Sequence, residues 1–127
     1  MKVEHIALYV QDLEGARTFF RDFFGAVSGP EYHNTQTGFR SYFLTFDGGS
    51  RLELMTRPGV QAVSGAQFPA GYAHLAFSVG SREAVDQLTD RLVRSGYQTL
   101  SGPRITGDGY YESCILGFEG NQIEITV

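Results

Sequence analysis

The sequence is poor in cysteine and has no long apolar run. Its one cysteine, Cys114, excludes a framework of disulfides within the chain and is typical of a reducing compartment. No stretch approaches the roughly 18 consecutive apolar residues that a membrane span needs. The opening residues 1–5 also lack the apolar segment of a secretory signal. We therefore expect a cytoplasmic protein with no membrane partner.

Positive charge is also scarce. The sequence carries 10 lysines and arginines against 14 aspartates and glutamates, and this formal net charge of −4 provides no electrostatic footprint for nucleic acid. With 42% hydrophobic and 19% charged residues, the composition is typical of a globular chain and not of a disordered one. The 127 residues suit one domain, whereas half of that length alone would be marginal.

The most informative pattern is an internal repeat. The segment 5–10 is echoed by the segment 74–79, and each is a histidine followed by the alternating residues of a strand. The segment 51–54 is echoed by the segment 122–125, and each places one glutamate between two apolar neighbours. The histidines and the glutamates recur at a period of roughly 70 residues, which indicates duplication of one structural unit.

Both copies predict the same order of elements, namely strand, helix, strand, strand, strand. In the first copy, Asp12 is a good N-cap and Gly25 a left-handed terminus for a helix with an apolar stripe. In the second copy, Ser81 caps a helix that stops at Gly96, and a linker with glycine and proline over 57–71 separates the copies. The expected strands are 3–10, 26–34 with an interruption at Gly29-Pro30, 39–46, 51–56, 72–79, 97–101, 110–118 and 121–127. The expected helices are 13–24 and 82–95, and a turn is expected at Gly102-Pro103.

One face of the predicted sheet collects ionisable residues. If the helices cover the apolar face, the opposite face presents His5, Glu53, His74 and Glu124. Two imidazoles and two carboxylates form a donor set that can hold a divalent metal. Any one of these residues alone would be interpreted as an ordinary surface side chain, and the repetition of both pairs is what favours a metal site. The apolar face is expected to hold Ile6, Leu8, Leu52, Leu54, Leu75, Phe77, Ile123 and Ile125.

Other residues of the chain have simpler interpretations. His33 has no counterpart in the second copy and is expected at the surface, and Cys114 is expected to be a small core residue. Arg51 and Met55 share the predicted face of Glu53, so they are candidates to line a cleft. An ion pair between Arg51 and a carboxylate is an equally good interpretation.

Across essentially its whole length, the chain resembles the vicinal oxygen chelate superfamily. That superfamily includes glyoxalase I, fosfomycin resistance proteins, bleomycin-binding proteins, extradiol dioxygenases and methylmalonyl-CoA epimerase. The resemblance implies an α+β domain of two tandem βαβββ modules, about 1–57 and 72–127, with a curved, U-shaped mixed sheet and the helices outside. It also implies a homodimer with one divalent metal ion per site, and the nitrogen and oxygen donors favour Ni, Co, Zn or Mn.

Glyoxalase I is the member that the chain resembles most closely. It has His, Glu, His and Glu as metal ligands where this sequence has His5, Glu53, His74 and Glu124. The resemblance implies a lyase or isomerase that works through a metal-stabilised enediolate, with Glu124 or Glu53 as general base. A small oxygenated molecule is the implied substrate, for example a thiol hemithioacetal of methylglyoxal. The chain departs from glyoxalase I at Tyr9, where those enzymes frequently carry an arginine that is used toward glutathione.

Two other classes of function compete with this prediction. One is a non-catalytic protein that binds a small molecule or confers resistance, and the other is a different enzyme of the superfamily, such as an epimerase, a dioxygenase or a thiol transferase. The bleomycin-binding members generally lack the metal set, and the epimerase commonly has glutamine at the position of Glu53. Ring cleavage and thiol transfer need open coordination positions that Glu53 crowds. Four intact ligands therefore favour a metal-dependent lyase or isomerase.

Overall fold

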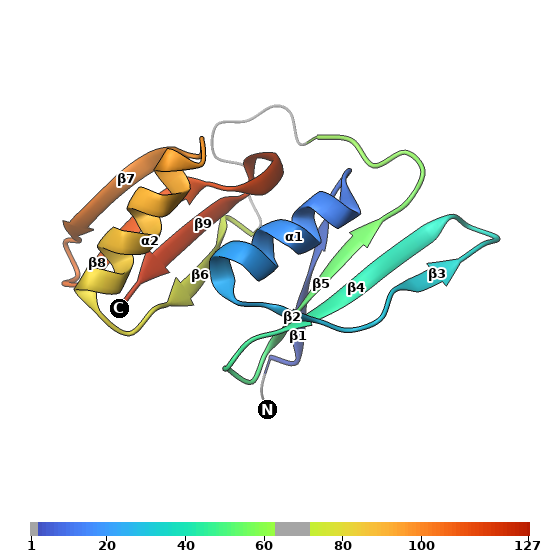
Figure 1. Ribbon diagram of the computed structural model, residues 1–127, viewed down its shortest axis with the longest axis horizontal. Coiled ribbons are helices and arrows are strands. Elements are labelled where there is room, and N and C mark those ends of the chain that lie inside the picture. Colours follow the sequence, from blue (N-terminus) through green and yellow to red (C-terminus); the bar gives the residue numbers. More distant parts are fainter. Residues whose placement is uncertain (1–2, 63–71) are drawn as a thin grey trace. The chain divides into compact units, whose positions relative to one another are not determined.

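The structure, a computed structural model, describes residues 3–62 and 72–127 (Figure 1). The chain divides into two compact units, Met1–Val63 and Ser64–Val127, and each unit has its own sheet and its own long helix. Part of the expected linker, residues 63–71, lies outside the described residues. Among the described residues, neither helix is long and apolar enough to cross a membrane.

The first unit is a mixed sheet with one helix on one of its faces. In chain order its elements are β1 (His5–Tyr9), α1 (Leu13–Phe24), β2 (Val27–Ser28), β3 (Tyr32–Asn34), β4 (Phe39–Thr45) and β5 (Arg51–Thr56). The strands lie in the order β1-β5-β4-β2, and β3 also pairs with β4. β1 runs parallel to β5, whereas the other pairs are antiparallel (Figure 1).

α1 forms because both of its ends are capped and one side of it is apolar. The carboxylate of Asp12 accepts a hydrogen bond from the backbone N–H of Gly15 at 2.9 Å, and Gly25 ends the helix with a φ of 66°. The apolar side of α1 packs on β4 and β5. The core of this unit includes Leu13, Ala16, Phe19, Phe20, Leu44, Leu52 and Leu54, all of them buried.

The second unit repeats this plan. In chain order its elements are β6 (His74–Ser78), α2 (Arg82–Arg94), β7 (Gln98–Ile105), β8 (Tyr111–Leu116), the short 3₁₀ helix η1 (Phe118–Gly120) and β9 (Gln122–Thr126). The strands lie in the order β6-β9-β8-β7, and β6 is parallel to β9. Ser81 caps α2 by accepting from the backbone N–H of Ala84 at 3.1 Å. The core of this unit includes Val85, Leu92, Ile115, Ile123 and Ile125.

These elements confirm the α+β class and the two βαβββ modules. Most predicted boundaries agree with the structure within two residues. The expected strand 26–34 is divided into β2 and β3, which both pair with β4. The division falls around Pro30, which has no backbone N–H to donate to a strand ladder.

The predicted turn at Gly102-Pro103 is wrong, because β7 continues through both residues. β7 is an edge strand of its sheet, where a proline without an N–H is tolerated, and its pairing with β8 contains two register shifts. Gly102 adopts a φ of 78°, and a Cβ at this position would lie 2.4 Å from the carbonyl oxygen of Glu112. The chain reverses later, where the backbone N–H of Thr106 donates to the carbonyl of Tyr110 at 2.8 Å.

The apolar face is best covered on the inner strands of each sheet. Leu54 on β5 and Ile125 on β9 are fully buried, as expected. Ile6 on β1 is 37% exposed, and Phe77 on β6 is half-buried. β1 and β6 are the outermost strands of their own sheets, so the helix of each unit covers them less completely.

Candidate metal centre

In the first unit, a histidine and a glutamate lie side by side on the face away from α1. Glu53 on β5 is paired with Ala7, two residues beyond His5 on the parallel strand β1. Leu52 and Leu54 are buried toward α1, so Glu53 between them points to the other face. The Nε2 atom of His5 lies 3.9 Å from Oε2 of Glu53. This distance is too long for a hydrogen bond, so Nε2 of His5 and Oε2 of Glu53 are not bonded to each other and could both coordinate one ion.

Glu4 supports the imidazole of His5 from its other side. The Nδ1 atom of His5 lies 2.5 Å from Oε2 of Glu4. An ionised carboxylate only accepts hydrogen bonds, so Nδ1 carries a proton, and in the neutral ring Nε2 then keeps its lone pair. This hydrogen bond is the main cause that lowers the pKa of Glu4, and Arg51 lowers it further. A carboxylate on the second ring nitrogen is the usual support of a metal-binding histidine.

Arg51 forms an ion pair with a carboxylate, which was one of the two roles that the sequence indicated for it. Its Nη2 atom lies 2.5 Å from Oε1 of Glu4, and its guanidinium lies 4.1 Å from the ring centre of Phe43. The ring of His5 meets the same phenyl ring edge-on at 5.4 Å. His33, by contrast, is exposed on β3, as expected.

The second unit contains the same pair in the same register. Glu124 on β9 is paired with Ala76, two residues beyond His74 on the parallel strand β6. The Nε2 atom of His74 lies 3.5 Å from Oε2 of Glu124. The side chains of His5 and His74 are 40% and 41% exposed, so a ligand can reach both rings. Each unit therefore brings together the histidine and the glutamate that the sequence repeat predicts for it.

Glu124 has two neighbours on β8 that the sequence did not assign to a site. Cys114 is paired directly with Glu124 and is half-buried on this face. The prediction that Cys114 lies in the core is therefore wrong. Its neighbour Ser113 takes the buried direction instead. Burial raises the pKa of Cys114, and the charges of Glu124 and Glu112 raise it further, so the thiol stays neutral.

Glu112 is the second of these neighbours. It lies diagonally across from Glu124, because Glu112 is paired with Thr126 and Cys114 with Glu124. Burial is the main cause that raises the pKa of Glu112, and the charge of Glu124 adds to it. A signal for this residue was present in the sequence, because Glu112 and Cys114 share one face of a predicted strand. Only the pairing of β8 with β9 shows that this face meets Glu124.

Each pair has donors and a spacing that fit part of a divalent-metal site. Two atoms bound to one ion at about 2.0 to 2.2 Å lie about 3 to 3.5 Å apart. The His74 and Glu124 atoms match this spacing, and the His5 and Glu53 atoms are wider by about 0.4 Å. Within residues 3–62 and 72–127, no group of three or more His, Cys, Asp or Glu side chains forms a ready metal site. The joining of the two pairs at one ion therefore stays a prediction.

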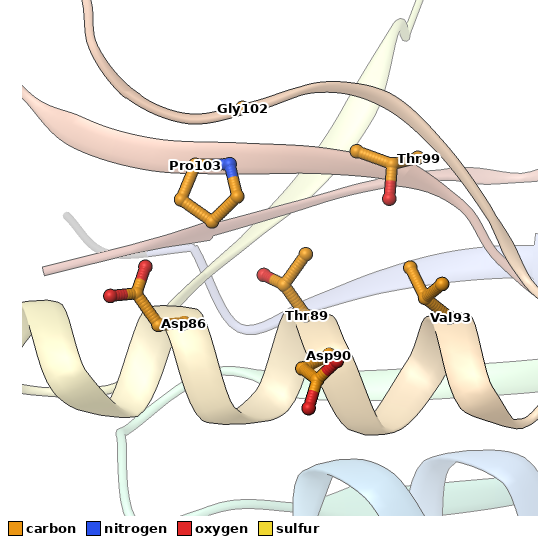
Figure 2. Close-up of a pocket in the computed structure, with 7 residues that line it drawn as sticks. All are labelled: Asp86, Thr89, Asp90, Val93, Thr99, Gly102 and Pro103. Carbon is orange, nitrogen blue, oxygen red and sulfur yellow. The ribbon is translucent and has the colours of Figure 1, made fainter.

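A hollow of about 410 Å³ lies on the other side of the second unit, between α2 and β7 (Figure 2). Its two carboxylates already have partners. Asp86 accepts a hydrogen bond from the hydroxyl of Tyr111 at 2.7 Å, and Asp90 forms an ion pair with Arg94 at 2.5 Å. None of the four predicted ligands lines this hollow. The hollow is therefore separate from the face of this unit that carries the pair of His74 and Glu124.

Comparison with known proteins identifies the class to which this fold belongs. Residues 2–125 match the Glyoxalase/Bleomycin resistance protein/Dioxygenase superfamily. The match spans nearly the whole chain, and the chain belongs to this superfamily. The uncharacterized protein YqjT of Bacillus subtilis (strain 168) is 32% identical over 117 residues, which are 86% of this chain and 85% of that protein.

Solved structures with the same fold include two proteins of known type. A trypanothione-dependent glyoxalase I of Leishmania major has a TM-score of 0.78 at 18% identity, over 99% of this chain and 86% of that chain. FosX, a fosfomycin resistance protein of Listeria monocytogenes in complex with Mn(II) and sulfate, has a TM-score of 0.73 at 20% identity, over 99% and 91%. At these identities the likeness establishes the fold alone.

Proposed function

We propose that the protein is a divalent-metal-dependent, glyoxalase-like lyase or isomerase and that four residues bind one ion, namely His5, Glu53, His74 and Glu124. The observation that carries the proposal is the same His/Glu pair in the same register in both units. Membership in the glyoxalase superfamily supports it. We propose a small oxygenated substrate, with a thiol hemithioacetal of methylglyoxal as the first candidate and Ni, Co, Zn or Mn as the ion.

A bound ion would supply a Lewis acid that stabilises the negative charge formed when a proton leaves a carbon next to a carbonyl. The role of the chain is to orient the substrate and to hold that proton. The carboxylate of Glu124 or Glu53 accepts the proton as general base and returns it to the neighbouring carbon. On the first unit, the hydrogen bond from Nδ1 of His5 to Glu4 keeps Nε2 available for ligation.

The experiment begins with metal analysis of the purified protein and continues with turnover of methylglyoxal in the presence of several thiols. Glu124→Gln should keep the fold and much of the metal, because an amide oxygen still coordinates, but it should lose proton transfer. His74→Ala should lose metal, because one of four ligands is gone. His33→Ala is the matched control, since His33 is an exposed histidine outside both pairs, and it should change neither property.

Two results decide between the functions. Full turnover by Glu124→Gln together with full metal occupancy in His74→Ala would exclude the four-ligand mechanism, whereas a wild-type protein that holds no metal and binds a small molecule without turnover would favour the non-catalytic binding protein. If both variants behave as expected, Glu53→Gln identifies the base. The base is the glutamate whose replacement lowers turnover more at full metal occupancy.

We further propose that the protein is a cytoplasmic homodimer and that the modules 1–57 and 72–127 act as one domain. β1 and β6 each lie at the edge of their own sheet, and such edges are commonly closed by pairing or by a symmetric partner. Light scattering at micromolar concentration tests the assembly, and a monomer would exclude the dimer.

A further inference from the structure

In the first unit, the face away from α1 continues past the His/Glu pair as a row of uncharged side chains (Figure 1). Strand by strand, the row consists of Tyr9 on β1, Met55 on β5, Ser41 on β4 and Tyr32 on β3, each paired with the next. Met55 lies on this face because its neighbour Leu54 is buried toward α1, and strand pairing carries the other three residues to the same face. We call these four residues the uncharged row.

The accessible surface of the uncharged row is mainly aromatic. The tyrosines at its two ends, Tyr9 and Tyr32, are 47% and 56% exposed, and Met55 is half-buried. Ser41 is fully buried, so its hydroxyl contributes little to the surface. Neighbouring strands lie about 4.8 Å apart, and four strands therefore make a row about 14 Å long. This is the length of a small ligand with one ring.

The row is continuous with the His/Glu pair. Phe43 is paired directly with Glu53, and its ring meets the imidazole of His5 edge-on at 5.4 Å. Met55 lies two residues beyond Glu53 on β5, which is about 6.6 Å along the strand. A molecule whose oxygen atoms are held at the pair therefore reaches the uncharged row with a single attached ring.

The charges near the row are already paired. Arg51 lies on this face, and its Nη2 atom binds Oε1 of Glu4 at 2.5 Å. The four described residues of the row carry no charge themselves. An anionic group placed there would lose water without gaining a partner, whereas a neutral ring gains contacts with tyrosine rings and with the methionine sulfur.

The second unit lacks this surface at the matching positions. Ser78 stands where the first unit has Tyr9, because each lies four residues after the histidine of its pair. Thr126 stands where the first unit has Met55, and Cys114 stands where it has Phe43. The βαβββ plan therefore does not require large apolar side chains on this face, and exposed apolar surface of this kind marks a binding surface.

We propose that the uncharged row binds an aromatic ring of the substrate and that Tyr9 and Met55 determine this specificity. The inference rests on the proposed function, because it places the reacting oxygen atoms at the pair of His5 and Glu53. The substrate is then a compound with two neighbouring oxygens, such as a hemithioacetal of a ketoaldehyde, that carries a neutral aryl group. The ring belongs to the ketoaldehyde part or to the thiol part, and both present the same chemistry to the row.

The test uses two neutral probes with two neighbouring oxygens that differ in the ring, namely benzohydroxamic acid and acetohydroxamic acid. The sequence has two methionines, and Met55→Leu identifies the ¹³C-methyl signal of Met55. A ring stacked on Met55 shifts this signal through its ring current. We expect benzohydroxamic acid alone to shift the signal, with or without Zn²⁺. With Zn²⁺ bound, it should bind about 10-fold more tightly than acetohydroxamic acid.

Variants of Tyr9 separate ring recognition from a structural effect. Tyr9→Ser introduces the residue type of the second unit and should weaken binding of benzohydroxamic acid about 2- to 10-fold, with binding of acetohydroxamic acid and of Zn²⁺ unchanged. Tyr9→Phe keeps the ring and should keep the affinity of the wild type. Tyr110→Ser is the matched control, because Tyr110 is a 59% exposed tyrosine of the second unit, and it should change none of these values.

Equal affinity of Tyr9→Ser and the wild type for benzohydroxamic acid would overturn the proposal. A Met55 signal that responds to neither probe would also overturn it, and so would one that depends only on protein concentration, because a second copy of the chain would then cover the row. If the wild-type protein binds no Zn²⁺, the proposed function fails separately. The Met55 signal of the metal-free protein still decides whether the row binds a ring.

Two substrate mixtures then assign the ring to one part of the substrate. Faster turnover of phenylglyoxal with 2-mercaptoethanol supports a ring on the ketoaldehyde, and faster turnover of methylglyoxal with thiophenol supports a ring on the thiol. In either case, Tyr9→Ser should lower kcat/KM for the preferred mixture about 2- to 10-fold. Turnover of methylglyoxal with 2-mercaptoethanol as fast as that of both aromatic mixtures would contradict the proposed specificity.

Discussion

Two hydroxyl groups connect α2 to β8 in the core of the second unit. The hydroxyl of Thr89 donates to the carbonyl of Val85 at 2.7 Å and lies 2.6 Å from the hydroxyl of Ser113. A hydroxyl has one proton, so Thr89 accepts its second hydrogen bond from Ser113. Thr89 is 4% exposed and Ser113 is fully buried, so bulk water does not replace a lost partner.

The two single substitutions are expected to have unequal costs. Ser113→Ala leaves Thr89 bonded to Val85, and we expect a loss of about 1 kcal/mol in the free energy of unfolding. Thr89→Val keeps the shape of the side chain but leaves the buried Ser113 hydroxyl without its acceptor, at a cost of about 2 kcal/mol. The double variant removes both hydroxyls. Its cost should be about 1 to 2 kcal/mol, below the sum of the single costs, because no buried hydroxyl is left unpaired.

Urea unfolding followed by far-UV circular dichroism measures these costs, since the sequence has no tryptophan for fluorescence. Thr18→Val is the control, because Thr18 is an exposed threonine on α1, and we expect a change within about 0.5 kcal/mol. If the effects at Thr89 and Ser113 add within about 0.5 kcal/mol, the two hydroxyls are not coupled and the reasoning is refuted.

Three further predictions concern other parts of the chain. Gly102→Ala should destabilise the protein by at least about 2 kcal/mol in the same urea assay, because its φ of 78° and a carbonyl oxygen 2.4 Å from the new Cβ oppose a side chain. Gly107→Ala, with no atom within 4 Å of its Cβ, should be nearly neutral. Glu4→Ala should leave stability unchanged, because Glu4 is exposed. It should weaken Zn²⁺ binding about 10-fold, because His5 loses the carboxylate that accepts its Nδ1 hydrogen bond. Equal Zn²⁺ affinities of the variant and the wild type would contradict this role. The pKa of Tyr42 is raised by its hydrogen bond to Glu14 and by burial. Subtraction of the ultraviolet titration of Tyr42→Phe from that of the wild type isolates Tyr42, and the midpoint of this difference curve should lie above the usual pKa of 10.0. The hydroxyl form therefore stabilises the fold below pH 10, and this stabilisation is lost as the pH rises through the higher pKa of Tyr42 in the folded protein. A midpoint at or below 10.0 would disprove this prediction.

The local fold could be predicted because each element carries its own signals. Asp12 and Gly25 mark the two ends of α1, and both take the capping roles that their residue types predict. The alternation of side chains places His5 and Glu53 on one face, and the structure has them 3.9 Å apart. These predictions need only the periodicity of one strand or one helix.

The neighbours of Glu124 on β8 could not be predicted, because their positions depend on strand pairing. Glu112 approaches Glu124 only once β8 is aligned with β9, and nothing in its own neighbourhood along the chain indicates that alignment. Cys114 is a small apolar residue in a predicted strand, and its direction is fixed by the burial of Ser113 next to it. The sequence at Gly102-Pro103 likewise does not show that β7 is an edge strand, where proline is tolerated.

Duplication explains why the two pairs agree while their surroundings differ. The histidine and glutamate of a pair meet only in one register, and a slip of one residue would turn one of them to the helix face. Glu4 and Glu112 occupy positions on which the register imposes no residue type, because Ala73 and Ser41 take the matching places in the other unit. Each half of a duplicated chain can therefore keep its His/Glu pair while the residues around the pair differ. If the two glutamates differ in the proposed role of general base, the difference is expected to come from the residues around each pair, because the two pairs consist of the same residue types.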